Sequence, residues 1–266
     1  MSEKTSLRTT FDKDASLYDK VRPGYPDALF EDIIKLSEIP TNGRILEIGC
    51  GTAQATLPFA ERGYAIHCIE LGANLAAIAE RKLSAYPRVH VSVGSFEEVT
   101  LEESTFDLVL SATAFHWIDP RVGYPKAARV LKPEGTLSLF WNKPVQTQVS
   151  ADYFSSLQTV YERVVPEMAR RFPGLPHPDA IPTPVKDEID RSRLFGEVKV
   201  LKYRWETDYT AQAYVELLNT YSDHIALENE TRAELFDGIQ NLIETHFGGR
   251  MVKEHLSILY LAQRKT

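Results

Sequence analysis

The sequence predicts an α/β fold in which helices cover both faces of a parallel sheet. Between residues 42 and 142, short apolar runs rich in β-branched residues alternate with segments of helical period. This alternation is typical of βαβ units, whose buried strands read as apolar runs. The chain has 266 residues, a net charge of −7 and two cysteines. A chain of this length buries enough apolar surface to fold without disulfides or metal.

Composition excludes several classes of protein. The 43% hydrophobic and 25% charged fractions are ordinary for a globular protein. The acidic net charge argues against a dedicated nucleic-acid binder. No run approaches the roughly 20 apolar residues of a membrane span. The polar N-terminus lacks the apolar core of a signal peptide. Cys50 and Cys68 form neither a disulfide framework nor a close zinc pair. We therefore expect a cytoplasmic monomer or homodimer without a metal, membrane or nucleic-acid partner.

Two helices are predicted before the alternating region. Residues 1–10 are polar and expected to be frayed. Residues 11–21 favour a short helix that ends before Pro23, because proline cannot continue a helix. Residues 27–36 carry apolar side chains at helical spacing and predict a second helix.

The alternating region supplies five strands and the helices that connect them. The predicted strands are residues 44–50, 64–70, 89–95, 106–112 and 136–141. The predicted helices are residues 53–62, 74–86 and 120–131, and a turn is predicted at Pro133-Glu134-Gly135.

Beyond residue 142 the pattern changes to longer helices and two further strands. We predict helices over residues 151–171, 211–221 and 228–247, strands over 197–209 and 250–262, and a proline-rich loop over 173–184. Such additions lengthen the connections around the last strands, where inserted segments often form a lid over a site.

The strongest motif is Glu47-Ile48-Gly49-Cys50-Gly51-Thr52, in which a strand ends in glycines before a helix begins. Glycines allow a tight turn and close approach of the backbone to a ligand, and ligands bind beyond the carboxyl ends of parallel strands. Glu70 ends the second strand, 70 − 51 = 19 residues after Gly51. A carboxylate there can accept hydrogen bonds from both hydroxyls of a ribose. Taken singly, the glycine turn could be an ordinary strand–turn–helix connection and Glu70 an ordinary surface glutamate. Their combination favours a nucleoside site.

The glycine loop differs from a dinucleotide fingerprint. The third glycine of that fingerprint is replaced by Gln54. Glu47 lies two residues before the first glycine, where a carboxylate suits a cationic ligand better than a pyrophosphate. S-adenosylmethionine carries a sulfonium and an ammonium and has no phosphate.

Five motifs, in order, resemble those of class I S-adenosylmethionine-dependent methyltransferases. They are Glu47-x-Gly49-x-Gly51, Glu70, Val93-Gly94-Ser95-Phe96-Glu97, Phe106-Asp107-Leu108-Val109 and Arg129-Val130-Leu131-Lys132-Pro133-Glu134-Gly135. Two further stretches resemble small-molecule methyltransferases of the trans-aconitate methyltransferase group. These are Tyr18…Arg22-Pro23-Gly24-Tyr25-Pro26 and Ala114-Phe115-His116-Trp117-Ile118.

The resemblance implies a doubly wound, Rossmann-like sheet of seven mainly parallel strands. Its strand order would be 3-2-1-4-5-7-6, with strand 7 antiparallel and helical insertions forming a cap. It also implies one methyltransferase domain over residues 1–266. Residues 1–40 would form a helical cover, 41–142 the cofactor-binding core, and 143–266 the insertions and last strands.

The resemblance implies S-adenosylmethionine as cofactor and S-adenosylhomocysteine as product. The candidate cofactor-binding residues are Tyr18, Arg22, Glu47, Gly49, Cys50, Gly51, Glu70, Leu71, Ser95, Phe96 and Ala112. Ser95 departs from the Asp or Asn of many family members, whereas Phe96 can stack on adenine. Arg22 is either a partner of the cofactor carboxylate or an ordinary surface arginine, and Cys50 is expected to contribute its backbone.

Methyl transfer is an in-line displacement that needs aligned reactants, and a base only if the acceptor is protonated. His116 follows the fourth strand and is the candidate base, with a structural role in its loop as the alternative. Trp117, Trp141 and Tyr203 are candidates for the acceptor pocket, and core packing is the alternative for each. The same two interpretations apply to the later residues Trp205, Tyr209, Tyr214, Tyr221 and His224.

The predicted function is therefore methyl transfer from S-adenosylmethionine to a small-molecule acceptor such as a carboxylate or phenol. Two alternatives remain open. One is a non-catalytic S-adenosylmethionine-binding regulatory domain, and the other is a NAD-dependent oxidoreductase.

Overall fold

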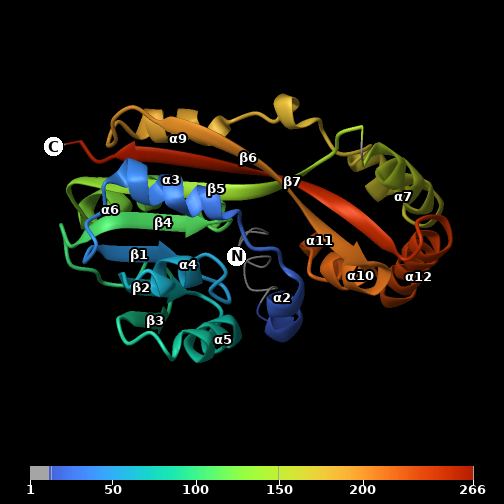
Figure 1. The fold of residues 1–266 in the computed structure, drawn as a ribbon, viewed down its shortest axis with the longest axis horizontal. Helices are drawn as coiled ribbons and strands as arrows, with labels where there is room; N and C mark the ends of the chain where they lie inside the picture. The colour runs from blue at the N-terminus through green and yellow to red at the C-terminus, as the bar shows by residue number, and fades with distance from the viewer. Residues whose placement is uncertain (1–11, 13, 149, 266) are drawn as a thin grey trace.

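The computed structural model describes residue 12, residues 14–148 and residues 150–265. The predicted frayed segment 1–10 and residues 11 and 13 of the predicted helix 11–21 lie outside the described residues. The α-helix observed in that region is α2 (Ala15–Val21), which Figure 1 shows beside the carboxyl edge of the sheet.

A seven-stranded sheet of order β3-β2-β1-β4-β5-β7-β6 forms the centre of the fold (Figure 1). The strands are β1 (Arg44–Ile48), β2 (Ala65–Glu70), β3 (Val89–Val93), β4 (Phe106–Ala112), β5 (Leu131–Val145), β6 (Lys199–Thr210) and β7 (Arg250–Gln263). The first five strands pair in parallel, and β7 is antiparallel to both β5 and β6. This confirms the predicted fold class, strand order and antiparallel strand.

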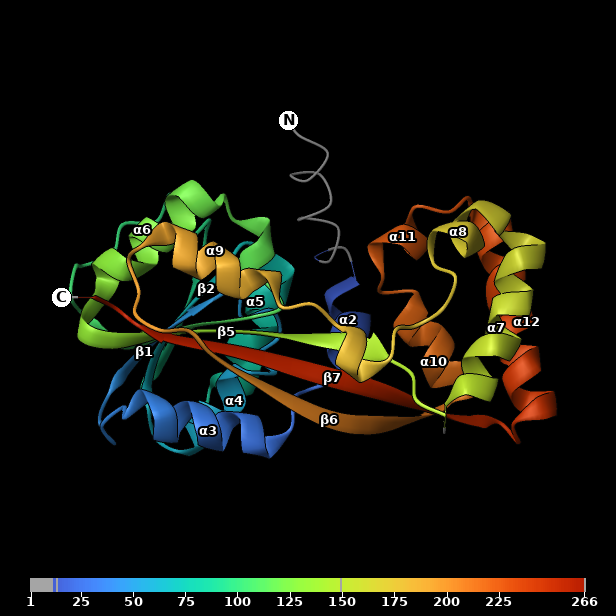
Figure 2. The same cartoon turned by 90° about the horizontal axis from the view of Figure 1, so that it is seen from above.

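Helices pack on both faces of the sheet, as Figure 2 shows. One face is covered by α3 (Asp27–Ser37), α4 (Thr56–Glu61) and α5 (Ala73–Leu83), and the other by α6 (Pro120–Val130) and α9 (Pro184–Ser192). Phe30, Phe59 and Phe140 meet edge to face in the first layer. Because strands such as β1 are buried on both faces, most of their residues are apolar, and Glu47 is an exception.

A helical cap stands beyond one end of the sheet. It contains α7 (Ala151–Val164), α8 (Pro166–Arg171), α10 (Ala211–Leu218), α11 (Ser222–Ile225) and α12 (Asn229–His246). The strands β6 and β7 leave the sheet and run into this cap (Figure 1). Tyr209 and Met251, near their far ends, pack in one apolar cluster with Leu157, Leu217 and Ile239 of the cap helices. The cap is therefore attached to the sheet by a continuous two-stranded ribbon.

Several predicted elements have different bounds. The helix predicted over 151–171 is divided at Pro166, because proline lacks the N–H that would continue α7. Within the loop predicted over 173–184, η3 (Pro178–Ala180) forms one turn, and the unpredicted α9 follows it with Ile189 as its buried contact. That helix carries one pair of core-facing apolar residues at helical spacing, Val185 and Ile189, which is a short signal beside a proline-rich loop.

The strand predicted over 136–141 is longer, and the predicted turn at residues 133–135 lies inside β5. Glu134 has a positive φ of 64° there, and the pairing of β4 with β5 shifts register between Phe106 and Leu108. Between the pairs formed by these two residues, β4 advances by two residues and β5 by five, so the irregularity places 5 − 2 = 3 extra residues in β5 without ending the strand. Short-range turn signals could not distinguish it from a true turn.

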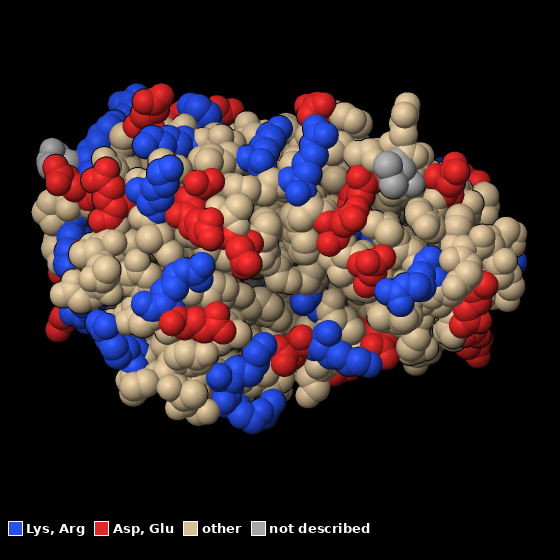
Figure 3. All heavy atoms as spheres, in the orientation of Figure 1, with Lys and Arg blue, Asp and Glu red and all other residues tan. Residues whose placement is uncertain are grey.

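Figure 3 shows acidic and basic residues interspersed over one face of the molecule. Among the described residues, no helix combines the length and apolar character that crossing a membrane requires.

Candidate functional site

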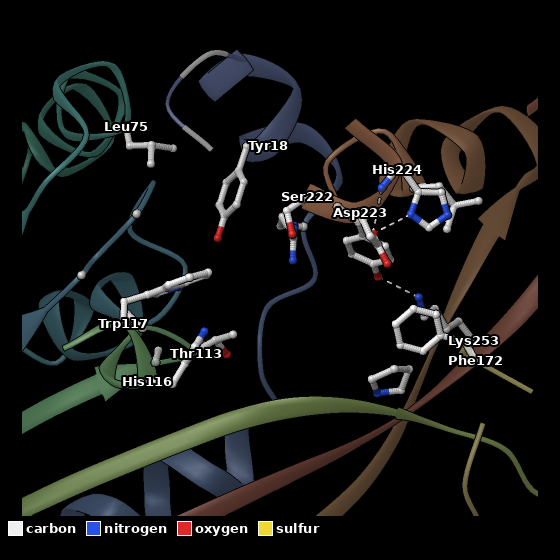
Figure 4. A pocket seen from close by; sticks show the side chains of 18 of the residues that line it. Tyr18, Leu75, Thr113, His116, Trp117, Phe172, Ser222, Asp223, His224 and Lys253 are labelled. Atoms are coloured by element: carbon white, nitrogen blue, oxygen red, sulfur yellow. Dashed lines mark hydrogen bonds and ion pairs between the residues drawn. The ribbon is translucent and has the colours of Figure 1, made fainter. Parts of the chain in front are cut away.

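A cavity of about 690 Å³ lies between the carboxyl edge of the sheet and the cap (Figure 4). Its volume is within the roughly 300–1,000 Å³ that small-molecule sites occupy. The sheet side is lined from the ends of β1, β2 and β4, together with α2, and the opposite side from α7, α10, α11 and β7. The location is the one expected for ligands of a doubly wound sheet.

The glycine loop after β1 forms part of the cavity wall. Gly49 has a φ of 72°, and a Cβ on it would lie 2.5 Å from the Cβ of Ala114. No larger residue fits that approach without moving the chain after β4. Gly51 has a φ of 57° and lies under the ring of Tyr18. An ideal Cβ on Gly51 would lie 3.7 Å from the nearest atom of that ring. The loop is thus shaped to bring backbone close to a ligand.

Glu70 holds this loop against the end of β2. Its Oε2 accepts a hydrogen bond from the Gly51 N–H at 2.8 Å, and its Oε1 accepts one from the Gly72 N–H at 2.9 Å. Burial raises the pKa of Glu70, while these backbone donors act in the opposite direction. Each carboxylate oxygen can accept more than one hydrogen bond, so the group retains capacity for a ribose diol.

Phe96, Leu71, Leu75 and Ile69 line the cavity beside Glu70 and offer an apolar surface suited to adenine. Ser95 does not line the cavity, and its hydroxyl donates to Glu97 Oε2 at 2.6 Å. The contribution of Ser95 to the cofactor site stays a prediction.

Arg22 is a half-buried residue between the N-terminal helix and the cap. Its Nη2 donates to the carbonyl oxygen of Thr220 at 2.7 Å. Its guanidinium carbon lies 5.0 Å from the ring centre of Tyr18 and 4.8 Å from that of Tyr221. Arg22 is thus a cavity residue and not an ordinary surface arginine.

Glu47 and Cys50 lie beneath the glycine loop and do not line the cavity. Side chains alternate along a strand, so Ile48 faces the cavity and Glu47 points the other way. The direct contact of Glu47 with the cofactor stays a prediction. Glu47 is 0% exposed. Burial raises its pKa to about 7, with the Thr56 side chain acting in the opposite direction and the charge of Glu70 in the same direction.

His116 lines the cavity within η2 (Phe115–Trp117), beside Trp117. Trp141 does not line the cavity. Its indole Nε1 donates to His116 Nδ1 at 3.1 Å. An indole N–H can only donate, so Nδ1 must accept and the neutral imidazole carries its hydrogen on Nε2. Trp141 therefore orients His116 as a hydrogen-bond donor, and its predicted place in the acceptor pocket stays a prediction.

Tyr203 is also away from the cavity, because its hydroxyl donates to Asp32 Oδ2 at 2.7 Å on the α3 face of the sheet. Of the other later aromatic residues, Trp205 and Tyr209 do not line the cavity. Tyr214, Tyr221 and His224 do.

The predicted residues that line the cavity are Tyr18, Arg22, Gly49, Gly51, Glu70, Leu71, Phe96, Ala112, His116 and Trp117. The predicted residues that do not are Glu47, Cys50, Ser95, Trp141 and Tyr203.

Sequence reasoning missed polar residues on the cap side of the cavity, among them Tyr161, Asp223 and Lys253. The Tyr161 hydroxyl lies 2.8 Å from His224 Nε2, and His224 Nδ1 lies 2.8 Å from Asp223 Oδ1. Burial acts to raise the pKa of Asp223, but hydrogen bonds from the His224 side chain and backbone hold it below its ordinary value. Strand alternation could have indicated the position of Lys253, because it places Lys253 on the same face of β7 as the buried Met251.

The described residues contain no cluster of three or more His, Cys, Asp or Glu side chains able to hold a metal ion.

Comparison with known proteins agrees with this geometry. Residues 46–139 match the family model described as "Methyltransferase domain". An uncharacterised methyltransferase of Mycobacterium tuberculosis is 25% identical over 243 residues, covering 91% of this chain and 89% of the relative. A malonyl-[acyl-carrier protein] O-methyltransferase of Geobacter sulfurreducens is 29% identical over 167 residues, covering 60% of this chain and 62% of the relative.

Solved structures share the fold. A putative type II methyltransferase from Anaeromyxobacter dehalogenans superposes with a TM-score of 0.60 at 24% identity, over 91% of this chain and 97% of the other. Haemonchus contortus phosphoethanolamine N-methyltransferase 2, in complex with S-adenosyl-L-methionine, gives a TM-score of 0.58 at 17% identity, over 100% of this chain and 60% of the other.

The methyltransferase domain match over residues 46–139, the ordered motifs and the sheet together show that the protein is an S-adenosylmethionine-dependent methyltransferase with the Rossmann-like fold of class I. These findings lend no support to a non-catalytic regulatory domain or a NAD-dependent oxidoreductase. The finer resemblance to trans-aconitate methyltransferases stays a prediction.

Glu70→Ala is expected to weaken binding of S-adenosylhomocysteine by about 10- to 100-fold, because it removes the acceptor for the Gly51 and Gly72 N–H groups together with the ribose partner. Calorimetric titration measures the dissociation constant. Glu80→Ala, at an exposed position of α5, is the matched control and should bind normally. Unchanged affinity in Glu70→Ala would mean that the ribose is bound elsewhere.

Glu47→Gln is expected to change the pH dependence of stability. Folding raises the pKa of Glu47 from 4.5 to about 7, so the folded state keeps a proton that the unfolded chain releases in this window. Wild-type stability therefore falls as pH rises through it, by about 3 kcal/mol at roughly 1.4 kcal/mol per pKa unit. Urea unfolding at about pH 4 and about pH 8 should show a growing advantage for the variant. A constant difference would contradict the raised pKa.

Proposed function

We propose that this methyltransferase transfers the methyl group of S-adenosylmethionine to a carboxylate oxygen of a small-molecule acceptor. The observation that carries the proposal is the tautomer of His116, which offers an N–H and no lone pair at Nε2. A residue held in this way can stabilise an acceptor oxygen but cannot remove its proton. A carboxylate arrives ionised and needs no base, whereas a phenol does.

The sheet side of the cavity fits the cofactor. The glycine loop offers the close backbone approach that a Cβ at Gly49 would prevent. Glu70 would accept the ribose hydroxyls, Phe96 and Leu71 would flank adenine, and Tyr18 would cover the glycine loop. Glu47, buried beneath the loop, would act on the cationic donor through its charge.

The bound cofactor supplies a methyl group made electrophilic by the adjacent sulfonium. His116 would donate Nε2–H to an acceptor oxygen and orient it, and Trp141 would keep the imidazole in that orientation. Ile48, Ala112 and Trp117 line the cavity around this point and exclude water. The C–S bond breaks as the C–O bond forms, so opposite charges on donor and acceptor disappear together. A cavity of low polarity favours such a step.

Two further observations support this proposal. The relative from Geobacter sulfurreducens is named for methylation at oxygen, on a malonyl-[acyl-carrier protein]. The cavity has room for an acceptor beside the cofactor, because it continues from the glycine loop to the cap helices. We also propose that residues 1–266 act as one methyltransferase domain, since the β6–β7 ribbon joins sheet and cap.

Carboxylate methylation predicts a base-labile product. The purified protein should transfer tritium from methyl-labelled S-adenosylmethionine to members of a panel of carboxylic acids, and mild alkali should release the label as volatile methanol. Phenols and amines matched in size serve as controls, because aryl ethers and N-methyl groups survive that treatment. An alkali-stable label would overturn the carboxylate acceptor.

His116→Ala is expected to lower kcat by about 10- to 100-fold, the effect of losing one hydrogen bond to a charged group, and to leave S-adenosylhomocysteine affinity nearly unchanged. His116→Gln retains an N–H donor and should recover part of the rate. His116 is not a base in this proposal. The fall of kcat/KM at low pH should therefore persist in both variants. Loss of that fall in His116→Ala would restore the base assignment.

A further inference from the structure

We propose that Lys253 and Tyr221 form an anion-binding pair that anchors a second anionic group of the acceptor, remote from the oxygen that is methylated. The proposal rests on the carboxylate acceptor above and narrows it to acceptors with negative groups at both ends. Lys253 and Tyr221 would then determine specificity at the cap side of the cavity.

Lys253 is a buried cation that lines the cavity. It is 3% exposed, and its Nζ donates to the Tyr221 hydroxyl at 2.8 Å. The same Nζ lies 5.5 Å from the ring centre of Tyr214 and 5.1 Å from that of Tyr221. No ion pair of Lys253 occurs among the described residues. A buried ammonium surrounded by aromatic rings is costly unless an anion joins it.

Tyr221 supplies the second donor. An ammonium has hydrogens but no lone pair, so the Tyr221 oxygen must accept the hydrogen bond from Lys253. The phenolic hydrogen is then available to donate in turn. Arg22 lies 4.8 Å from the centre of the same ring, which places a second positive charge close by. A carboxylate can accept from Lys253 with one oxygen and from Tyr221 with the other.

The acidic side chains nearest to Lys253, in the sequence or among the cap-side cavity residues, form hydrogen bonds with other groups. Asp223 is held by the His224 ring and backbone N–H. Glu254, on the opposite side of β7, accepts hydrogen bonds from Thr147 and Ser150. Lys253 therefore projects a positive field into its surroundings. Burial, with a smaller contribution from the charge of Lys253, lowers the pKa of His255 to about 3.

The pair is separated from the methyl-transfer region. In Figure 4, Lys253 and His224 lie on one side of the cavity, and His116, Thr113 and Trp117 lie on the other, with Tyr18 and Ser222 between them. An acceptor that contacts both His116 and Lys253 would therefore span the cavity, with a negative group at each end and an apolar middle that contacts Leu218 and Leu157.

Matched pairs of acceptors test the anchor. Each pair is a dicarboxylic acid and its monoamide, namely glutarate and glutaramate, adipate and adipamate, and terephthalate and 4-carbamoylbenzoate. In wild type, kcat/KM is expected to be about 10- to 100-fold higher for the best of the three diacids than for its monoamide, mainly because the diacid has the lower KM. This exceeds the statistical advantage of two equivalent carboxylates. Lys253→Met should abolish the preference, and Tyr221→Phe should reduce it.

A binding measurement separates this proposal from the proposed function. Calorimetric titration of the S-adenosylhomocysteine-saturated protein with the same compounds needs no turnover. One outcome is that wild type binds a diacid selectively and Lys253→Met loses that selectivity, while no carboxylate is methylated. That result would overturn the carboxylate acceptor and leave the proposed anchor standing. Equal binding of diacid and monoamide by wild type, or an unchanged preference in Lys253→Met, would overturn the anchor.

Two controls guard against indirect effects. Lys199→Met removes the same charge at an exposed position of β6 and should retain the wild-type preference. S-adenosylhomocysteine affinity and thermal unfolding should be close to wild type in Lys253→Met. Because Tyr221→Phe deletes only a hydroxyl, it keeps the test decisive if Lys253→Met fails to fold.

Discussion

The antiparallel pairing of β7 with β5 and β6 is the constraint on which the rest of the structure depends. Leu259 and Leu261 of β7 are buried in the core of the sheet, whereas Met251 of the same strand is buried in the cap. One strand thus belongs to both apolar clusters. The cap is held over the carboxyl edge of the sheet, and a cavity lies between them. Lys253 reaches the cavity because it lies on this shared strand.

The two halves of the cavity have different chemistry. On the sheet side, carboxylate and backbone groups at Glu70 and the glycine loop suit a cationic nucleoside. On the cap side, the buried ammonium of Lys253 and the aromatic rings around it suit an anion. His116 stands on the sheet side as a donor. A site with this division favours a reaction in which a cationic donor meets an anionic acceptor.

Much of the fold was predictable, because its information is local. Glycine positions, apolar strand runs and helical periods lie within short windows, and the ordered motifs implied the strand order that the structure confirms. The exceptions have local causes as well: Pro166 divides a helix, and Glu134 adds an irregularity without ending β5. Helix α9 offers one i,i+4 pair of core-facing apolar residues, Val185 and Ile189, which is a short signal beside a proline-rich loop.

The sequence by itself determined the class of fold and the residues around the glycine loop, because Gly49, Gly51 and Glu70 act through the backbone within one βαβ unit. Tertiary structure decided which side chains meet across the cavity. Trp141 and Tyr203 occupy strand positions like those of cavity residues, yet each donates a hydrogen bond elsewhere. The acceptor side is assembled from segments far apart in the chain. Their meeting depends on packing between cap and sheet, which no single segment encodes.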